Sequence, residues 1–156
     1  EQDNRDECAF AYRRSALQGR GAVVVKAELE CERQEPQGIR RLMLEDLRER
    51  RRKFPRKQPN CGSVFLSTSA MHARVGPPGK VIEGAGLKGA RIGKAEVSHQ
   101  HANFIVNLGG ATSEDVLSLI AHIRKVVHER IGFDLCCEVR YVSPSGDIIP
   151  AHQAVN

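Results

Sequence analysis

Hydrophobic and polar residues alternate most regularly between residues 23 and 31. The apolar positions recur at every second residue, at Val23, Val25, Ala27, Leu29 and Cys31. A period of two is typical of a strand that buries one face, so we predict a strand here. Because one strand is not stable alone, we expect it to belong to a sheet whose other strands lie upstream.

Two longer segments have the helical period. Residues 37–54 place apolar side chains on one side and end at Pro55, which predicts a helix. Residues 112–131 open with Thr112-Ser113-Glu114-Asp115, a capping-box pattern, and stop before Gly132. The second helix carries its apolar stripe at Val116, Leu119, Ile120, Ile123, Val127 and Ile131.

The segments between these helices are shorter. Pro77-Pro78 predicts the start of a short helix over residues 80–85, and extended structure is expected over 91–98, 103–108 and 135–142. From residue 37 to 145 the pattern therefore predicts an α+β domain, with a small sheet packed with two to three helices. Residues 146–156 contain turn-forming residues and are expected to form a loose tail.

Composition narrows the class of protein only moderately. The chain has 156 residues, a formal net charge of +5, no Trp and two Tyr. The positive charge suits an anionic partner, either nucleic acid or a phosphorylated small molecule. No apolar run approaches the roughly 20 residues of a membrane span. The first residue is Glu1 and not Met, so we expect the chain to continue from a longer polypeptide.

The five cysteines follow no regular spacing, and no pair has the separation of a zinc site. The odd number favours reduced thiols and a cytoplasmic protein. His99 and His101 are spaced like metal ligands, but no third ligand is near in sequence, so we expect a polar loop and no metal.

Three further patterns are ambiguous on their own. Ser63 follows a Pro-Asn turn signal and Gly62, which indicates a tight bend that serves either as a turn or as a site for chemistry. The basic residues 48–53 form either a solvated helix end or an anion site. Glu138, within an apolar strand pattern, is solvated, paired with Arg140 or functional.

The letters Gly84-Ala85-Gly86-Leu87-Lys88-Gly89 match the dinucleotide-binding pattern. That pattern requires a strand before the glycines and a helix after them, whereas here a helix precedes and extended structure follows. We therefore interpret these glycines as a helix C-cap and a turn.

Five motifs taken together resemble the UDP-N-acetylenolpyruvoylglucosamine reductase family over about residues 8–142. In order, the motifs are Tyr12-Arg13-Arg14-Ser15, Pro59-Asn60-Cys61-Gly62-Ser63-Val64-Phe65, Ile82-Glu83 through Gly89, Arg91-Ile92-Gly93 with Val97-Ser98, and Glu138-Val139-Arg140. The resemblance implies that residues 1–36 are the tail of an FAD-binding α+β domain and that 37–145 form a substrate-binding domain.

The resemblance also implies a reaction, in which NADPH reduces FAD and the flavin passes a hydride to the enolpyruvyl group of a UDP-sugar during peptidoglycan synthesis. Most of the FAD contacts would come from a region upstream of this chain, which is thus an expected partner. A UDP-sugar substrate accounts for the positive charge without nucleic acid or a membrane.

Site residues are implied position by position. Ser63 resembles the proton donor, and Arg13 and Glu138 resemble groups that stabilise the developing charge. The resemblance assigns the substrate to Tyr12, Lys53, Lys88 and His101, and the cofactor to Ser15.

Two features depart from the family and keep an alternative open. Ser67 stands where the family usually has a substrate-contacting Asn, and the glycine-rich flavin segments are absent. The alternative is a degenerate, non-catalytic module that binds a nucleotide sugar or a protein. An RNA-binding function rests only on the charge and the Arg-rich segment.

Overall fold

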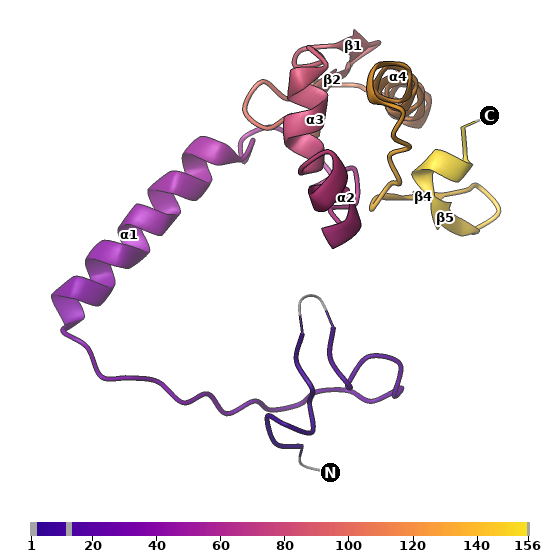
Figure 1. The fold of residues 1–156 in the computed structure, drawn as a ribbon. Helices are drawn as coiled ribbons and strands as arrows, with labels where there is room; N and C mark the ends of the chain where they lie inside the picture. Colours follow the sequence, from indigo (N-terminus) through magenta and orange to yellow (C-terminus); the bar gives the residue numbers. More distant parts are fainter. Residues whose placement is uncertain (1–2, 12–13, 156) are drawn as a thin grey trace. The chain divides into compact units, whose positions relative to one another are not determined.

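The computed structural model describes residues 3–11 and 14–155, which fall into two compact units, within residues 1–38 and 39–156. Figure 1 shows the elements of both units. The division lies close to the boundary predicted between residues 36 and 37. Tyr12 and Arg13 lie outside the described residues.

The described residues of the first unit form turns before the helix that starts at Pro36. The side-chain oxygen of Asn4 accepts the backbone N–H groups of Asp6 and Glu7 at 2.9 and 3.0 Å. The strand predicted over residues 23–31 is wrong for this structure: the segment is extended without a ladder, and Val25 is 93% exposed. A strand needs a neighbour for its N–H and C=O groups, and the described residues provide none here.

Helix α1 (Pro36–Lys53) confirms the predicted helix, and its last turn carries Arg50, Arg51, Arg52 and Lys53. None of its residues is buried. Its apolar side, formed by Ile39, Leu42, Met43, Leu44 and Leu47, is exposed. The helix therefore has the amphipathic pattern of a helix that packs on a core, but its apolar side packs on none of the described residues to the point of burial.

The second unit is built on a three-stranded antiparallel sheet, β1 (Arg91–Ile92), β2 (Ala95–Val97) and β3 (Ile105–Asn107), in that order. Glu96 of the central strand pairs with Arg91 on one side and Val106 on the other. The small sheet confirms the predicted α+β class, although its strands are shorter than the segments predicted.

Two short helices precede the sheet. Helix α2 (Ser69–Arg74) was not predicted, because six residues with one buried side chain, Met71, are too short for a periodic signal. Thr68 caps it by accepting the Met71 N–H. Helix α3 (Pro78–Gly84) confirms the predicted short helix, and positive φ angles at Gly86 and Gly89 confirm the turn that follows it.

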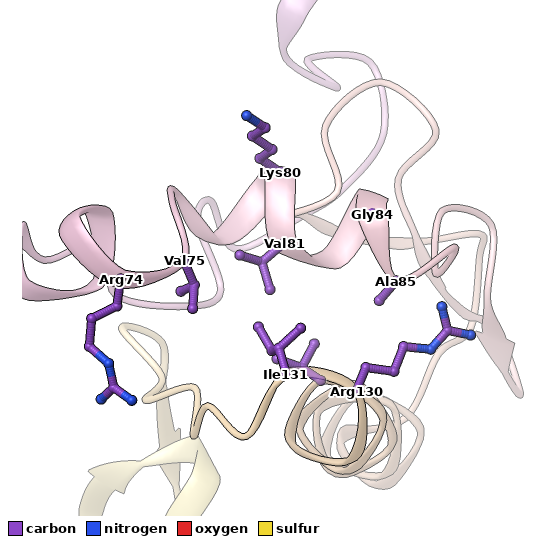
Figure 2. Close-up of a pocket in the computed structure, with 9 residues that line it drawn as sticks. Arg74, Val75, Lys80, Val81, Gly84, Ala85, Arg130 and Ile131 are labelled. Carbon is purple, nitrogen blue, oxygen red and sulfur yellow. The ribbon is translucent and has the colours of Figure 1, made fainter.

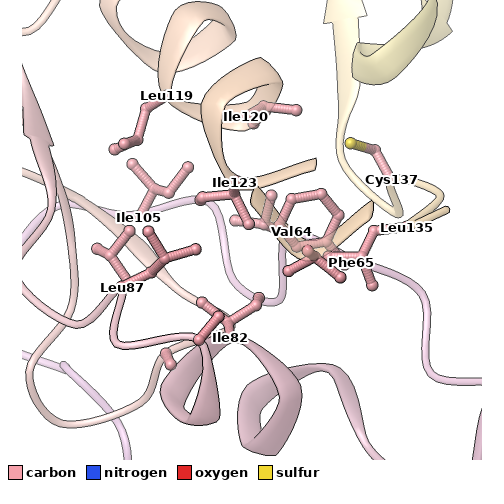
Figure 3. Packing of buried hydrophobic residues seen from close by; sticks show 14 of the residues in the cluster. Val64, Phe65, Ile82, Leu87, Ile105, Leu119, Ile120, Ile123, Leu135 and Cys137 are labelled. Atoms are coloured by element: carbon pink, nitrogen blue, oxygen red, sulfur yellow. The ribbon is translucent and has the colours of Figure 1, made fainter. Parts of the chain in front are cut away.

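Helix α4 (Ser113–Ile131) begins at the predicted capping box and ends at Gly132, which has φ 62°. Its buried residues are Leu119, Ile120, Ile123 and Val127. These side chains pack with Val64, Phe65, Ile82, Leu87, Ile105, Leu135 and Cys137 in one core (Figure 3). Ile131, predicted in the same stripe, is 46% exposed at the helix end.

The C-terminal residues are not the loose tail that we predicted. Strand β4 (Arg140–Val142) pairs antiparallel with β5 (Ile148–Pro150), and a 3-10 turn, η1 (Ala151–Gln153), follows. Ala151 is buried, and the Nδ1 atom of His152 accepts the Cys137 N–H at 2.9 Å. Pro150 and the polar residues 143–147 are typical of a loop, which is why a loose tail was predicted. In the structure residues 143–147 form the turn of the β4–β5 hairpin, and Pro150 is the last residue of β5.

Candidate functional site

The segment around Ser63 is held on both sides by backbone geometry. Before it, the Asn60 side-chain oxygen accepts the Gly62 N–H at 3.0 Å, and Gly62 adopts φ 84°, which favours glycine. After it, Val64 and Phe65 are buried in the core. Ser63 itself is half-buried at this transition from turn to core.

Glu138 lies beside this segment because of a β-bulge. Phe65 pairs with Cys137, and the N–H groups of Glu138 and Val139 both donate to the Val64 carbonyl, at 2.8 and 3.4 Å. Two residues thus face one, the arrangement that re-aims side chains next to active sites. The bulge brings Glu138 next to the residue that follows Ser63.

The Glu138 carboxylate is exposed. Among the described residues, no ion pair joins it to Arg140, and no side-chain hydrogen bond involves Glu138 or Ser63. The pairing with Arg140 that the sequence left open is therefore not formed. Both side chains are available to a ligand as far as the described residues are concerned.

Three predicted substrate residues lie near one ring system, although 48 positions separate the first from the last in the sequence: Lys53, Lys88 and His101. The Lys53 Nζ lies 5.8 Å from the centre of the Phe54 ring, and that ring stacks on His101 with centroids 5.4 Å apart. Lys88 is close enough to act on His101 electrostatically, and its ammonium pairs with Glu83 at 2.7 Å. The structure thus gathers three residues that the resemblance assigned to substrate.

The His101 ring is packed from several sides. Phe104 meets it edge-on at 5.1 Å, and a Cβ atom on Gly79 would lie 2.9 Å from its Cε1 atom, so only glycine fits there without movement. Burial lowers the pKa of His101, and the positive charges of Lys53 and Lys88 lower it further against the opposing effect of Glu83. The ring is therefore neutral near pH 7.

Asn103 connects the basic residues to the Ser63 segment. Its backbone N–H donates to the Nδ1 atom of His101 at 3.2 Å. Its carbonyl accepts the Val64 N–H at 2.9 Å, and its side chain exchanges two hydrogen bonds with the Phe65 backbone. Sequence reasoning missed this residue because its partners are 38 positions away; a buried Asn between apolar residues was the available signal.

Other predicted residues are not part of this cluster as far as the structure describes it. Tyr12 and Arg13 fall outside the described residues. Ser15 belongs to the first unit, whose placement relative to the second is not described. Within residues 3–11 and 14–155 no group of His, Cys, Asp and Glu side chains has the geometry to hold a metal ion. In the same residues no helix is long and apolar enough to cross a bilayer.

A pocket of about 430 Å³ lies elsewhere, between α3 and α4 (Figure 2). Its floor is apolar, with Val81, Ala85 and Ile131, and Arg74, Lys80 and Arg130 stand around it. Arg74 and Arg130 occupy the last turns of α2 and α4, where cations offset the helix dipole. The positions of Arg74 and Arg130 are thus explained without a ligand, and none of the predicted site residues lines the pocket.

Comparison with known proteins gives consistent matches. Residues 54–142 match the sequence model of "UDP-N-acetylenolpyruvoylglucosamine reductase, C-terminal domain". The chain is 49% identical to UDP-N-acetylenolpyruvoylglucosamine reductase 1 of Corynebacterium glutamicum, over 98% of this chain and 46% of that protein. It is 45% identical to the reductase of Heliobacterium modesticaldum, over 90% of this chain and 44% of that protein.

A solved structure supports the same relationship. The crystal structure of UDP-N-acetylenolpyruvylglucosamine reductase from Thermus caldophilus matches with a TM-score of 0.60 and 35% identity, over 83% of this chain and 44% of that one. The chain therefore spans less than half the length of the relatives that it matches.

Proposed function

Because this chain belongs to the UDP-N-acetylenolpyruvoylglucosamine reductase family, through the C-terminal domain of that enzyme, we propose that it binds the substrate and delivers the proton in this reduction. The observation that carries the proposal is the bulge that sets Glu138 beside the Ser63 segment. The complete polypeptide is then an oxidoreductase of peptidoglycan synthesis acting on the enolpyruvyl ether of a UDP-sugar.

FAD and NADPH are the cofactors of the proposed reaction, and reduced FAD would supply the hydride. The described residues of 3–35 form turns and extended chain, without a helix terminus or a sheet edge that could cradle a flavin diphosphate. These residues do not by themselves fit the group, so we assign the flavin mainly to the part of the relatives that this chain does not span. The chain's own contribution is to the substrate and the proton.

The basic residues suit the anionic parts of the substrate. A UDP-sugar with an enolpyruvyl group carries a diphosphate and a carboxylate, and Lys53 and Lys88 each lie close enough to His101 to lower its pKa. Neutral His101 adds no charge to this group but keeps the Phe54 ring stacked beneath Lys53. We propose that both lysines attract and orient the substrate.

Ser63 is the proposed proton donor to the substrate carbon next to the carboxylate. A serine hydroxyl is a weak acid, so its transfer requires a group that stabilises the alkoxide at once. A nearby cation, Arg13 or Lys53, would meet that need. By resemblance, Arg13 and Glu138 also stabilise the charge that develops on the substrate and assist its protonation. The net change adds one hydride and one proton across the enolpyruvyl double bond.

The test compares variants of the complete polypeptide that contains this chain. We expect Ser63→Ala to lower kcat by at least about 100-fold, since general acid catalysis contributes about 10²–10⁴-fold. Flavin content and flavin reduction by NADPH should stay normal, and Glu138→Gln should lower the same step. Ser69→Ala, an exposed serine in α2, is the matched control and should behave as wild type.

Two results would contradict the proposal. A complete polypeptide that binds no flavin would favour the non-catalytic binding module, particularly if calorimetry still detected a UDP-sugar. Wild-type turnover by Ser63→Ala would remove the proton-donor role. The cytoplasmic location and the absence of nucleic-acid and membrane partners remain predictions from the sequence.

A further inference from the structure

We propose that Asn103 is a positioning residue that holds the Ser63 hydroxyl in register for proton transfer. The proposal rests on the function proposed above. It concerns a residue to which the resemblance assigns no role, at the point where the basic residues meet the Ser63 segment.

The contacts of Asn103 are concentrated on the two residues after Ser63. Its carbonyl accepts the Val64 N–H, its Oδ1 accepts the Phe65 N–H, and its Nδ2 donates to the Phe65 carbonyl, at 2.9, 2.9 and 3.0 Å. Asn103 is 5% exposed and Phe65 is 1% exposed. Water therefore cannot easily replace these hydrogen bonds if the side chain is removed.

The geometry explains why Ser63 responds to Asn103. The peptide group between Ser63 and Val64 contains the Val64 N–H, so the backbone carbonyl of Asn103 fixes the plane to which the Ser63 Cα is attached, a contact that every Asn103 variant keeps. The Asn103 side chain fixes the chain one residue further on, through the N–H and the carbonyl of Phe65. The Val64 carbonyl is fixed from the opposite edge by Glu138 and Val139. Asn103 and the bulge thus hold one segment from both sides, and Ser63 is the first residue outside it.

Removing the side chain leaves the buried N–H and carbonyl of Phe65 without partners. The segment then relaxes to recover hydrogen bonds, and a displacement of about 1 Å in a catalytic group can lower the rate by about 100-fold. Substrate affinity depends on other residues in the proposal, chiefly Lys53 and Lys88. The effect should therefore fall on kcat and leave KM within about threefold.

Asn103→Asp provides a variant of nearly the same size. One oxygen of the introduced carboxylate can still accept the Phe65 N–H. The other oxygen replaces the Asn103 Nδ2 donor, so it cannot hydrogen-bond to the Phe65 carbonyl and is repelled by it. Protonation restores the donor, and burial raises the pKa of such a carboxyl group. The variant should therefore regain activity as the pH falls, which Asn103→Ala cannot do.

Other titratable groups near this position must be considered in the pH profile. His101 accepts the Asn103 N–H, with Lys53, Lys88 and Glu83 acting on its ring, and Glu138 lies across the Val64 carbonyl. These groups are the same in wild type and in both Asn103 variants. Comparison at each pH therefore isolates the introduced carboxyl group.

The experiment uses the flavin-loaded complete polypeptide and measures steady-state kinetics from pH 8 to 6. We expect Asn103→Ala to lower kcat by about 100-fold with flavin reduction by NADPH unchanged. The double variant Ser63→Ala/Asn103→Ala should be no slower than Ser63→Ala, because a residue that acts only through Ser63 adds nothing once Ser63 is gone. Hydrogen exchange at the Phe65 amide should accelerate in Asn103→Ala.

Asn107→Ala is the matched control. Asn107 lies on β3 and its Oδ1 accepts two backbone N–H groups, from Gly109 and Ala111, at 2.8 and 3.0 Å. The control loses similar hydrogen bonds with no side-chain contact to the Ser63 segment, so it should lose stability and keep kcat. The inference is overturned if Asn103→Ala retains kcat, or if both asparagine variants lower kcat equally. It is also overturned if Asn103→Asp shows no recovery at low pH.

The two single variants separate this inference from the proposed function. If Ser63→Ala is inactive in the proton step but Asn103→Ala is normal, only the positioning role fails. If Ser63→Ala turns over as wild type, the proton-donor role fails, whatever the result for Asn103.

Discussion

His101 and His152 share a feature at the scale of single residues: each uses Nδ1 to accept a backbone N–H. The donors are Asn103 at 3.2 Å and Cys137 at 2.9 Å. The neutral ring must therefore carry its proton on Nε2, and a proton on Nδ1 would break the hydrogen bond. Burial lowers the pKa of both histidines, with Lys53 and Lys88 adding to the effect at His101 and Arg124 at His152.

These lowered pKa values predict a loss of stability on mild acidification. Below the ordinary histidine value of about 6.5, the unfolded chain takes up protons that the folded chain resists, so unfolding is favoured as the pH falls. Urea midpoints should therefore be lower at pH 5.5 than at pH 7.5. His101→Gln and His152→Gln should each reduce this difference, whereas His122→Gln, at an exposed position, should leave it unchanged.

An equal pH difference in all three variants would contradict this assignment. Carboxylates such as Asp115, whose pKa is lowered by the Thr112 and Lys94 N–H groups, lose their stabilising charge only in more acidic solution. They are not expected to contribute between these two pH values.

At the scale of elements, one side chain joins the start of α4 to the β1–β2 turn. Asp115 accepts the Thr112 N–H at 3.1 Å, completing the capping box, and also accepts the Lys94 N–H at 3.2 Å. Thr112 in return accepts the Asp115 N–H at 3.0 Å. The Asp115 side chain thus connects the first turn of α4 to the sheet.

Removal of the cap should have a measurable cost. Thr112→Ala is expected to lower the free energy of unfolding by about 1 kcal/mol, because it removes the acceptor for one exposed helix donor. Ser113→Ala, at the next and equally exposed position, should change it by no more than a few tenths. Equal losses in the two variants, measured by urea unfolding, would show that the cap is not the cause.

The elements that could be predicted are those whose signal lies in neighbouring residues. Helix α4 combines a cap, a periodic stripe and Gly132, and α3 follows a proline pair, so both were predicted. Helix α2 has too few residues for periodicity. The alternation at 23–31 has the period of a strand, but a ladder also requires a neighbouring strand, which residues close in sequence do not determine.

The same distinction applies to the candidate site. Ser63 and Glu138 were identified through motifs, and the bulge that brings their segments together was not visible in the sequence. Asn103 was missed because its role depends on a contact across 38 positions. Pairings of that range are decided by packing of the whole core.

At the scale of the whole molecule, exposed apolar side chains include those of α1 and of the segment before it. The apolar side of α1 is exposed, and so are Val23, Val25 and Leu29 in the segment before it. The chain spans less than half of its relatives. We therefore expect the remaining part of the complete polypeptide to cover both places and to pair with residues 23–31.

Hydrogen exchange can test this coverage. In the complete polypeptide, amides 23–31 should exchange at least about tenfold more slowly than in the chain alone, because a strand ladder protects them. The amides of α4 are the control and should be protected in both. Equally fast exchange at 23–31 would contradict the expectation, and protection that depends on the concentration of the chain alone would indicate a second copy instead.

The bulge opposite Val64 also governs where the chain can change in length during evolution. Side chains alternate along a strand, so loss of one residue at Glu138 or Val139 would shift the following strand by one position. The side chain of Tyr141 would then point to the opposite face of the strand, and so would those of its neighbours. The hairpin of β4 and β5 would present the wrong face to the core. The polar turn at 143–147 connects the two strands outside their paired residues, so insertions there leave the pairing intact. Natural variation in length should therefore collect in this turn and be absent between Leu135 and Arg140.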